Sequence, residues 1–145
     1  MTQAAADPVD EIDAELVTIC TRHAGVLRAK DVVAFARNPK TALHECFEWD
    51  DSEAAEKYRQ WQARDLIRVR VTVIDGVEES IRAYVSLMPD RVDGGAYRPM
   101  VTVLSNNEMR AQLLADAAAE FAVFRKKYGG IKELAKLFEV ADRVL

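Results

Sequence analysis

The hydrophobic pattern of this chain changes its period near residue 67, and that change constrains the fold more than any other feature. Asp51 to Leu66 repeats with the spacing of an amphipathic helix, whereas Ile67 to Val73 and Ile81 to Leu87 alternate apolar and polar residues. Such alternation predicts half-buried strands, and the intervening Asp75-Gly76 predicts a tight turn. We therefore expect a long helix followed directly by a β-hairpin.

Two shorter helices are expected before this unit. Asp7-Pro8 places an N-cap acid before a proline at the first helical position, and Gly25 ends the segment. A second helix is expected from Ala29 to Arg37, where Asn38-Pro39 stops it, and Thr41 to Trp49 is compatible with one helical turn. Helices followed by a hairpin are the layout of a winged-helix module. The expected fold class is therefore α+β, with a winged-helix-like N-terminal module followed by a C-terminal helical hairpin.

The C-terminal helical hairpin is predicted from spacing and from its breaks. Met100 to Leu104 is expected to form a short third strand or a packed extended segment. Ser105 and Glu108 then fit a capping box at the start of a long helix. Gly129-Gly130 breaks that helix, and a final helix is expected after it.

The length and composition fit one compact unit. The chain has 145 residues, of which 50 % are hydrophobic, so it can bury a real core. We expect a winged-helix-like module with an acidic N-terminal tail over residues 1–89, and a connector with a two-helix extension over residues 90–145. Cys20 and Cys46 do not suggest a disulfide framework. With no signal-peptide pattern and no window near the roughly 20 apolar residues of a membrane span, we expect a soluble, intracellular protein without a membrane partner.

The charge is distributed unevenly along the chain. A formal net charge of −4 argues against strong non-specific binding to nucleic acid. Residues 7–15 hold five acids and residues 45–56 hold six, and neither block contains a base. Basic residues cluster between and after these blocks, so the local sign of the charge is more informative than the net value.

The expected hairpin would carry the clearest candidate binding face. If its apolar positions pack on helices, the opposite face gathers arginines beside an aromatic ring: Arg68, Arg70, Thr72, Arg82, Tyr84 and Ser86. Guanidinium groups bind phosphate oxygens bidentately, so this face could meet a nucleic-acid backbone. The alternative is a solvated sheet face whose arginines blunt an edge against aggregation.

The helix from Asp51 to Leu66 is the candidate recognition helix. Ala54, Tyr58, Trp61 and Asp65 mark one stripe, and the opposite stripe presents residue types able to read base edges: Lys57, Gln60 and Arg64. Its first turn is acidic, however, and would repel phosphate. Contact is therefore expected through the C-terminal half of the helix, the hairpin and the cations Arg28 and Lys30. The full candidate DNA-binding set is Arg28, Lys30, Lys57, Gln60, Arg64, Arg68, Arg70, Arg82 and Tyr84.

Other chemistries have weaker support in the sequence. Cys20-x-x-His23 and His44-x-Cys46 contain zinc-ligand types, but at awkward spacing, so apolar packing of the cysteines is favoured. The paired acids Asp50-Asp51 and Glu78-Glu79 are better explained by helix capping and solvation than by catalysis. Gly94-Gly95 lacks the lysine of a phosphate loop. We expect no catalytic residue, metal or cofactor.

The segment from Phe47 to Val73, with the pattern FEWDD…AAEKYR.WQAR…IR, resembles a group of small uncharacterised proteins encoded in tailed-phage and prophage genomes. The likeness extends from His23 through the expected hairpin, and more loosely over the C-terminal helices. It implies a phage or prophage origin and a location in the cytoplasm of the bacterial host. It assigns no activity and no functional residue.

These observations lead to two hypotheses. The first is a non-enzymatic phage or prophage accessory protein that binds double-stranded DNA in regulation, replication or recombination. The second is a protein-interaction or assembly component, of a virion or a replication complex, that uses the acidic block at 45–56 and the C-terminal helices. A homodimer through those helices is left open by the sequence.

Overall fold

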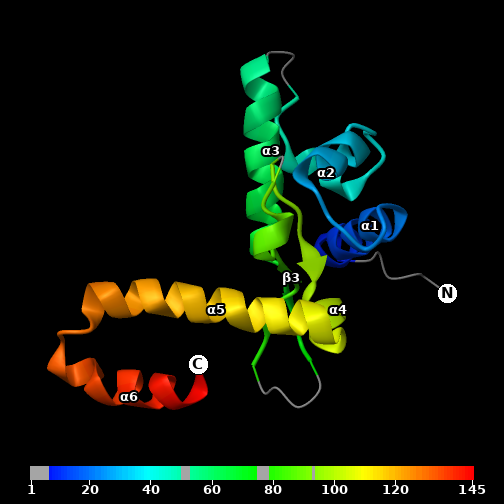
Figure 1. Cartoon of the computed structure of the whole chain (residues 1–145). Coiled ribbons are helices and arrows are strands. Elements are labelled where there is room, and N and C mark those ends of the chain that lie inside the picture. Colours follow the sequence, from blue (N-terminus) through cyan, green and yellow to red (C-terminus); the bar gives the residue numbers. More distant parts are fainter. Residues whose placement is uncertain (1–6, 50–52, 75–78, 93) are drawn as a thin grey trace.

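The structure is a computed structural model, and it describes residues 7–49, 53–74, 79–92 and 94–145. The chain forms a helical body from which a two-helix arm projects to one side (Figure 1). Helices account for 67 % of the structure and strands for only 8 %. The α+β winged-helix prediction is therefore wrong, because no winged sheet forms among the described residues.

The first helix begins and ends where the sequence predicts. Helix α1 spans Pro8–Arg22, and the Asp7 carboxylate accepts a 3.1 Å hydrogen bond from the backbone N–H of Val9. After the helix, Ala24 and Gly25 adopt positive φ angles of 57° and 78°. Glycine takes up this left-handed conformation without steric cost, which allows the chain to turn back toward the body.

The core forms where α1 meets the next two helical segments. Helix α2 spans Ala29–Ala36, and the 3₁₀ helix η1 spans Ala42–Cys46. Val32, Val33 and Ala36, the residues of α2 expected to face inward, are buried. Around the predicted turn, Leu43 and Phe47 are buried and Trp49 is partly buried. The largest fully buried side chains of the molecule are Leu16, Ile19, Leu27, Leu43, Ile67, Val32, Val33 and Val103.

Helix α3, Glu53–Arg68, runs past the predicted start of the hairpin. Ile67 is fully buried because it continues the inward stripe of Arg59 and Ala63 at helical spacing. The capping residues expected at Asp50 or Asp51 lie outside the described residues.

The predicted hairpin pairs over only two residues in each strand, and a second short sheet forms where the prediction had continued it. Strand β1, Val71–Thr72, pairs with β2, Ile81–Arg82, whereas β3, Tyr84–Val85, pairs with β4, Arg98–Pro99. The return segment changes partner at Ala83, whose N–H donates to Arg70 O and whose carbonyl accepts from the Met100 N–H. The pairing of β1 with β2 is antiparallel as expected, while the predicted Asp75-Gly76 turn lies outside the described residues.

This rearrangement reverses part of the predicted facing of side chains. Val69, Val71 and Val73 are 64 %, 61 % and 72 % exposed, although the alternation predicted that they face the core. Tyr84, expected on the open face, is buried. The reason is that two-residue strands do not maintain a period of two over the whole segment, so the surrounding helices determine which face is covered.

A short 3₁₀ turn lies between β3 and β4, and the chain after β4 is mostly helical. The 3₁₀ turn η2 spans Met88–Asp90, and α4 spans Met100–Ser105, so the predicted third strand or extended segment is wrong. Helix α5, Asn107–Tyr128, is capped by Asn106, which accepts a 3.0 Å bond from Met109 N–H, and not by the predicted serine. The break at Gly129 is confirmed, and it is followed by η3, Lys132–Leu134, and by α6, Ala135–Val144.

The arm, α5 with α6, is joined to the body near its base. The buried Asp116 carboxylate accepts hydrogen bonds from Met88 N–H at 2.9 Å and from the Gln112 amide at 2.8 Å. Beyond this tie α5 extends away from the body, and α6 folds back along it (Figure 1). In the part of the chain that is described, no helix combines the length and the apolar character that crossing a bilayer requires.

Candidate nucleic-acid interface

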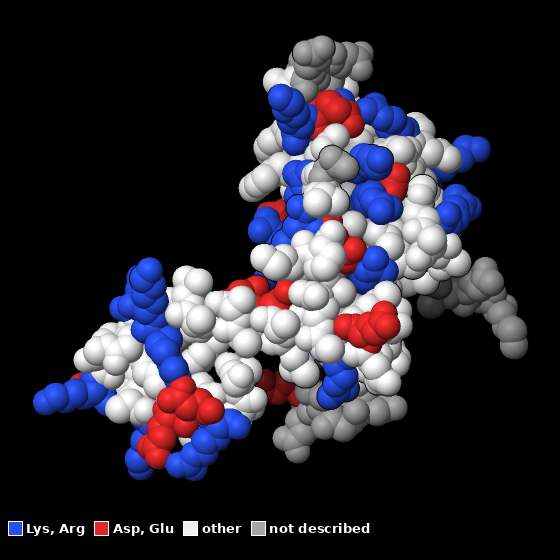
Figure 2. All heavy atoms as spheres, in the orientation of Figure 1, with Lys and Arg blue, Asp and Glu red and all other residues white. Residues whose placement is uncertain are grey.

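The outer face of α3 combines cations with an exposed aromatic ring. Because Arg59, Ala63 and Ile67 face inward, positions three or four residues apart on the other side share one outward stripe. That stripe, the α3 stripe, consists of Lys57, Trp61, Arg64 and Arg68. Figure 2 shows Lys and Arg side chains gathered around α3 and the neighbouring body, whereas the middle of the arm is largely uncharged on this face.

Trp61 does not stand alone on this surface. Its ring stacks on that of Tyr58, with centroids 5.8 Å apart and planes inclined by 17°. The two residues are 51 % and 49 % exposed. The sequence placed Tyr58 and Trp61 on one stripe of the helix, and the structure shows that this stripe faces solvent.

A shallow hollow of about 330 Å³ lies beside the Trp61 ring. Leu66, Val69 and Cys46 contribute apolar atoms to its lining, and Gln62 and Asp65 contribute polar ones. The Gln62 amide oxygen is buried and has no hydrogen-bond partner among the described residues. An unsatisfied buried acceptor costs free energy. A hydrogen-bond donor brought close to the amide, or a rotation of the amide group, would therefore be stabilising.

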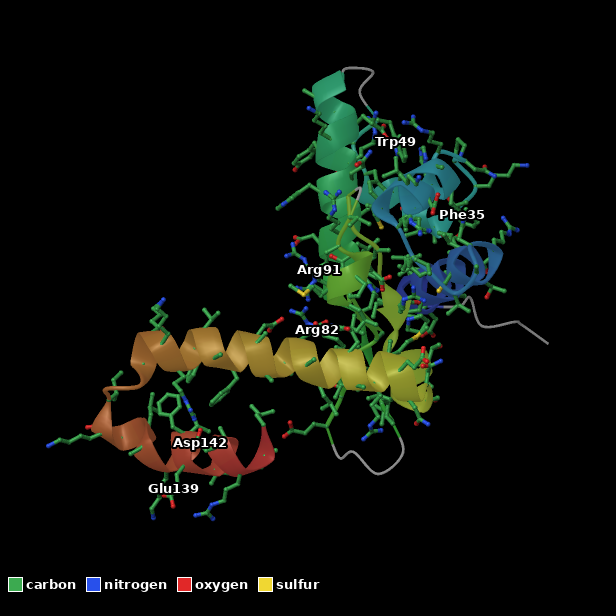
Figure 3. The ribbon with its side chains drawn as sticks, in the orientation of Figure 1. Phe35, Trp49, Arg82, Arg91, Glu139 and Asp142 are labelled. Carbon is green, nitrogen blue, oxygen red and sulfur yellow. The ribbon has the colours of Figure 1, made fainter. Side chains whose placement is uncertain are left out.

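The lower end of the α3 stripe opens into a second concavity, which we call the arginine cleft. This cleft of about 390 Å³ lies between the end of α3, the short sheets and α5, and its charged lining residues are Arg68, Arg82, Arg91, Asp116 and Glu120. Figure 3 places Arg82 and Arg91 in the corner where the lower end of α3 approaches α5.

The three arginines of the cleft are held differently. Arg68 pairs with Asp65 on its own helix, and Arg91 donates to Ser86 O at 3.0 Å and lies 3.8 Å from Glu120. The Arg82 side chain has no hydrogen-bond or ion-pair partner within the described part of the chain. Its guanidinium is therefore the cleft donor that an incoming anion can engage without breaking an existing contact.

Two of the predicted DNA-binding residues are withdrawn from the surface. Arg70 is 15 % exposed and lies 3.5 Å from Asp13, while its Nε donates to Leu66 O. Tyr84 is 7 % exposed, and this burial raises the pKa of its hydroxyl to about 12. The prediction that these two side chains lie with Arg68 and Arg82 on one open sheet face is therefore wrong, although Tyr84 does border the arginine cleft.

The predicted base-reading stripe is partly covered. The Arg64 Nε–H donates to Gly94 O at 3.1 Å, which draws the connector over this side of α3. Gly94 has a φ of 89°, and a Cβ there would lie 3.2 Å from the Arg64 guanidinium, so glycine permits the close approach. Lys57 is exposed, whereas Gln60 is half-buried.

Arg28 and Lys30 belong to a different part of the body. Arg28 caps the start of α2 and Lys30 lies in its first turn. Neither residue lines the arginine cleft or the hollow beside Trp61. The cleft also contains Arg91, which was not among the predicted DNA-binding residues. Arg91 lies in an irregular connector, where the sequence has no periodic pattern.

The acidic block before α3 is partly neutralised by its own neighbours. Glu56 pairs with Arg37 and, at 3.1 Å, with the buried Arg59. Arg59 also donates to Glu48 O at 2.8 Å and lies over the Trp49 ring, as does Arg37. These contacts anchor α3 to the end of α2 and offset the charge of Glu56.

Cys20, His44 and Cys46 are used in packing, whereas His23 is exposed and lies 3.6 Å from Asp31. The His44 ring stacks on Trp49 at 4.8 Å, and its Nδ1 lies 2.7 Å from Ala36 O. Burial raises the pKa of the Cys20 thiol, and also that of Cys46. Within the described residues no three His, Cys, Asp or Glu side chains gather in an arrangement that could hold a metal ion.

Within the described residues, the candidate interface consists of a cationic helix face, a stacked aromatic pair and an arginine-lined cleft. Such a surface can bind anions and stack on planar rings. Comparisons with protein-family models, curated proteins and solved structures found no significant match to this chain.

Proposed function

We propose that this protein binds DNA without altering it covalently, as an accessory protein in regulation, replication or recombination. The observation that carries the proposal is the position of Arg68. It ends the α3 stripe and also lines the arginine cleft, so the cations of the two features form one track: Lys57, Arg64, Arg68, Arg82 and Arg91.

The chemistry of this track suits a phosphate backbone. Guanidinium groups donate two parallel hydrogen bonds to phosphate oxygens, and such contacts position a nucleic acid without reading its sequence. The net charge of −4 means that binding depends on the local track and not on a general positive field. We therefore expect moderate affinity and a strong dependence on salt.

The biological setting is part of the same proposal. The resemblance of residues 47–73 to small phage and prophage proteins supports a role in phage biology, in the cytoplasm of a bacterial host.

Fluorescence anisotropy with labelled DNA at two salt concentrations tests the proposal. The folded protein should bind at low salt, and its affinity should fall steeply as salt is raised, because bound phosphates release counterions. Arg68→Glu combined with Arg82→Glu should abolish binding, because both side chains are exposed and the cleft would become acidic.

Arg143→Glu is the matched control, since Arg143 is an exposed arginine on α6 that does not line the cleft. Circular dichroism would verify that each variant keeps its helices. A folded wild-type protein that binds no DNA even at low salt would remove the proposal.

The exposed surface of α6 favours a second candidate function, in protein assembly. Leu137, Val140 and Val144 lie on one stripe and are 46 %, 55 % and 75 % exposed. A helix with a second apolar stripe commonly packs against another element. This function predicts self-association in sedimentation experiments, and Val140→Glu should abolish it. If the protein self-associates in this way and binds no DNA, the function lies in the arm and not in the track.

A further inference from the structure

We propose that the nucleic acid bound by this protein is single-stranded, and that Trp61 provides the stacking platform for one of its unpaired bases. This inference rests on the proposed function and specifies its ligand. It departs from the double-stranded DNA expected from the sequence, because that expectation depended on a winged-helix fold that the structure does not contain.

The geometry of the aromatic pair supports an unpaired base. Tyr58 and Trp61 are nearly parallel and about half exposed, so a third flat ring can extend the stack on a free face. In a duplex the faces of the bases are covered by neighbouring base pairs, and only their edges and the backbone meet a protein. A single strand offers its base faces, and aromatic residues bind them with little regard to sequence.

The hollow beside Trp61 provides a place for such a base. Its apolar lining, from Leu66 and Val69, suits the ring, while Gln62 and Asp65 border it with polar groups. Gln62 is the side chain whose buried amide oxygen lacks a partner in the described structure. A base edge carries both donors and acceptors, so it can satisfy this amide once the amide turns toward the hollow.

The cations are spaced to follow the backbone of the same strand. Lys57 and Arg68 are eleven residues apart on α3, which corresponds to about 16 Å along the helix axis. At about 3.4 Å per stacked nucleotide, this length covers four or five nucleotides. Trp61 lies between these cations, so backbone and base contacts fall on one continuous face.

The mixture of residues also argues against a protein partner at this face. An exposed tryptophan and tyrosine alone would suit a protein interface as well as a base. Protein interfaces are enriched in arginine but depleted in lysine, so Lys57 is the residue of this face that disfavours a protein partner. Lys57 and Arg64 flank Trp61 on the helix face, and that combination is typical of surfaces that track a single strand.

The test compares three labelled ligands of equal length by anisotropy: a 16-nucleotide oligo-dT, the corresponding oligo-rU, and a 16-base-pair DNA duplex. The wild-type protein should bind the single strands more tightly than the duplex, and the two oligonucleotides distinguish DNA from RNA. Trp61→Ala should weaken binding of the single strand about tenfold or more. Trp61→Phe should largely preserve it, because a ring remains.

Fluorescence supplies a second readout that a structural role of Trp61 would not reproduce. A base stacked on Trp61 should quench tryptophan emission in the wild-type protein, and the quenching should be lost in Trp61→Phe although anisotropy still reports binding. Trp49, the other tryptophan, is held between arginines and His44 and should not respond. Val123→Ala, at an exposed site on α5, is the control.

The outcomes separate this inference from the proposed function. Binding of duplex as tight as that of oligo-dT, unaffected by Trp61→Ala, would overturn the single-strand inference and leave DNA binding intact. Failure of a folded protein to bind any of the three ligands at low salt would overturn both. A loss in Trp61→Ala that Trp61→Phe does not rescue would also contradict the stacking role.

Discussion

The body and the arm of this molecule are stabilised by different amounts of apolar burial. In the body, Leu16, Leu27 and Val32 are completely enclosed by α1, α2, η1 and α3. In α6 the buried residues are Phe138 and Ala141, and much of the apolar surface of the arm faces solvent. Two helices packed on one another can cover only one stripe of each, which explains the difference.

The arm compensates with a cluster centred on Arg125. Phe138 contacts the rings of Phe121 and Phe124 at 5.8 Å and 6.0 Å. The Arg125 guanidinium pairs with Asp142, donates to Phe138 O at 2.9 Å and lies over the Phe121 ring. Figure 3 shows Asp142 directed toward α5 and Glu139 directed away from it. The comparison shows that the body is held by a core and the arm by a few contacts.

The largest effect is expected in the body. Leu27→Ala should lower the free energy of unfolding by about 2–5 kcal/mol, because it leaves a cavity at a fully buried site. Leu27 also exchanges two 2.7 Å backbone hydrogen bonds with Tyr97, and these should survive the change. Urea denaturation followed by circular dichroism measures the loss, with Val69→Ala as an exposed control. A small effect of Leu27→Ala would show that the body does not depend on this core.

A smaller and more local effect is expected in the arm. Phe138→Ala should destabilise α6 by about 2 kcal/mol, below the roughly 3–5 kcal/mol of a phenylalanine in a closed core, because its surroundings are already partly open. Hydrogen exchange should show faster exchange in α6 and the distal half of α5, with α1 and α2 unchanged. If protection were lost equally throughout the chain, body and arm would be one cooperative unit and the comparison would fail.

Breaking the hydrogen bonds of Asp116, which join the arm to the body, should lower the free energy of unfolding by a smaller amount. Asp116→Ala removes the acceptor of the Met88 N–H and of the Gln112 amide, which should cost about 1–2 kcal/mol. Asp116→Asn keeps one oxygen and should be milder. NMR relaxation should then report faster independent motion of α5 with an unchanged body. Identical relaxation in wild type and Asp116→Ala would mean that other contacts hold the arm.

The smallest effect is a loss of stability at alkaline pH, and it arises from Tyr84, a buried residue of the body. The pKa of Tyr84 is raised from 10.0 to about 12 by burial, so the unfolded chain loses this proton first. Stability from this group is complete below pH 10 and is lost as pH rises from 10 to 12, with a loss of about 1 kcal/mol near pH 10.5. Urea midpoints across this range should fall in the wild type and fall less in Tyr84→Phe. Parallel curves for the two proteins would contradict the assignment.

Much of the helical framework could be predicted from local signals. Asp7-Pro8, Asn38-Pro39 and Gly129-Gly130 lie at or next to the ends of helices, as the sequence indicated. These positions act through backbone geometry and hydrogen-bond capping, which need no distant partner. The inward face of α2 followed equally from the spacing of its apolar residues.

The candidate site could be predicted only in part. Lys57, Arg64, Arg68 and Arg82 were identified from the sequence and lie along one track. Arg70 and Tyr84 were assigned to the same face, but the first is drawn to Asp13 and the second is buried. The sequence placed Tyr58 and Trp61 on one stripe but gave no signal that this stripe is exposed, because aromatic residues at helical spacing usually indicate a buried face.

By itself the sequence determined where α1 begins and ends, where α2 ends and where α5 breaks, which residues of α2 enter the core, and that the chain carries separated acidic and basic blocks. These properties depend on neighbours within a few residues. Tertiary structure alone decided that α3 would continue through Ile67, that the return segment would divide between two partners, and that Trp61 would face solvent. Burial of a residue depends on what packs against it, and the packing elements come from distant parts of the chain.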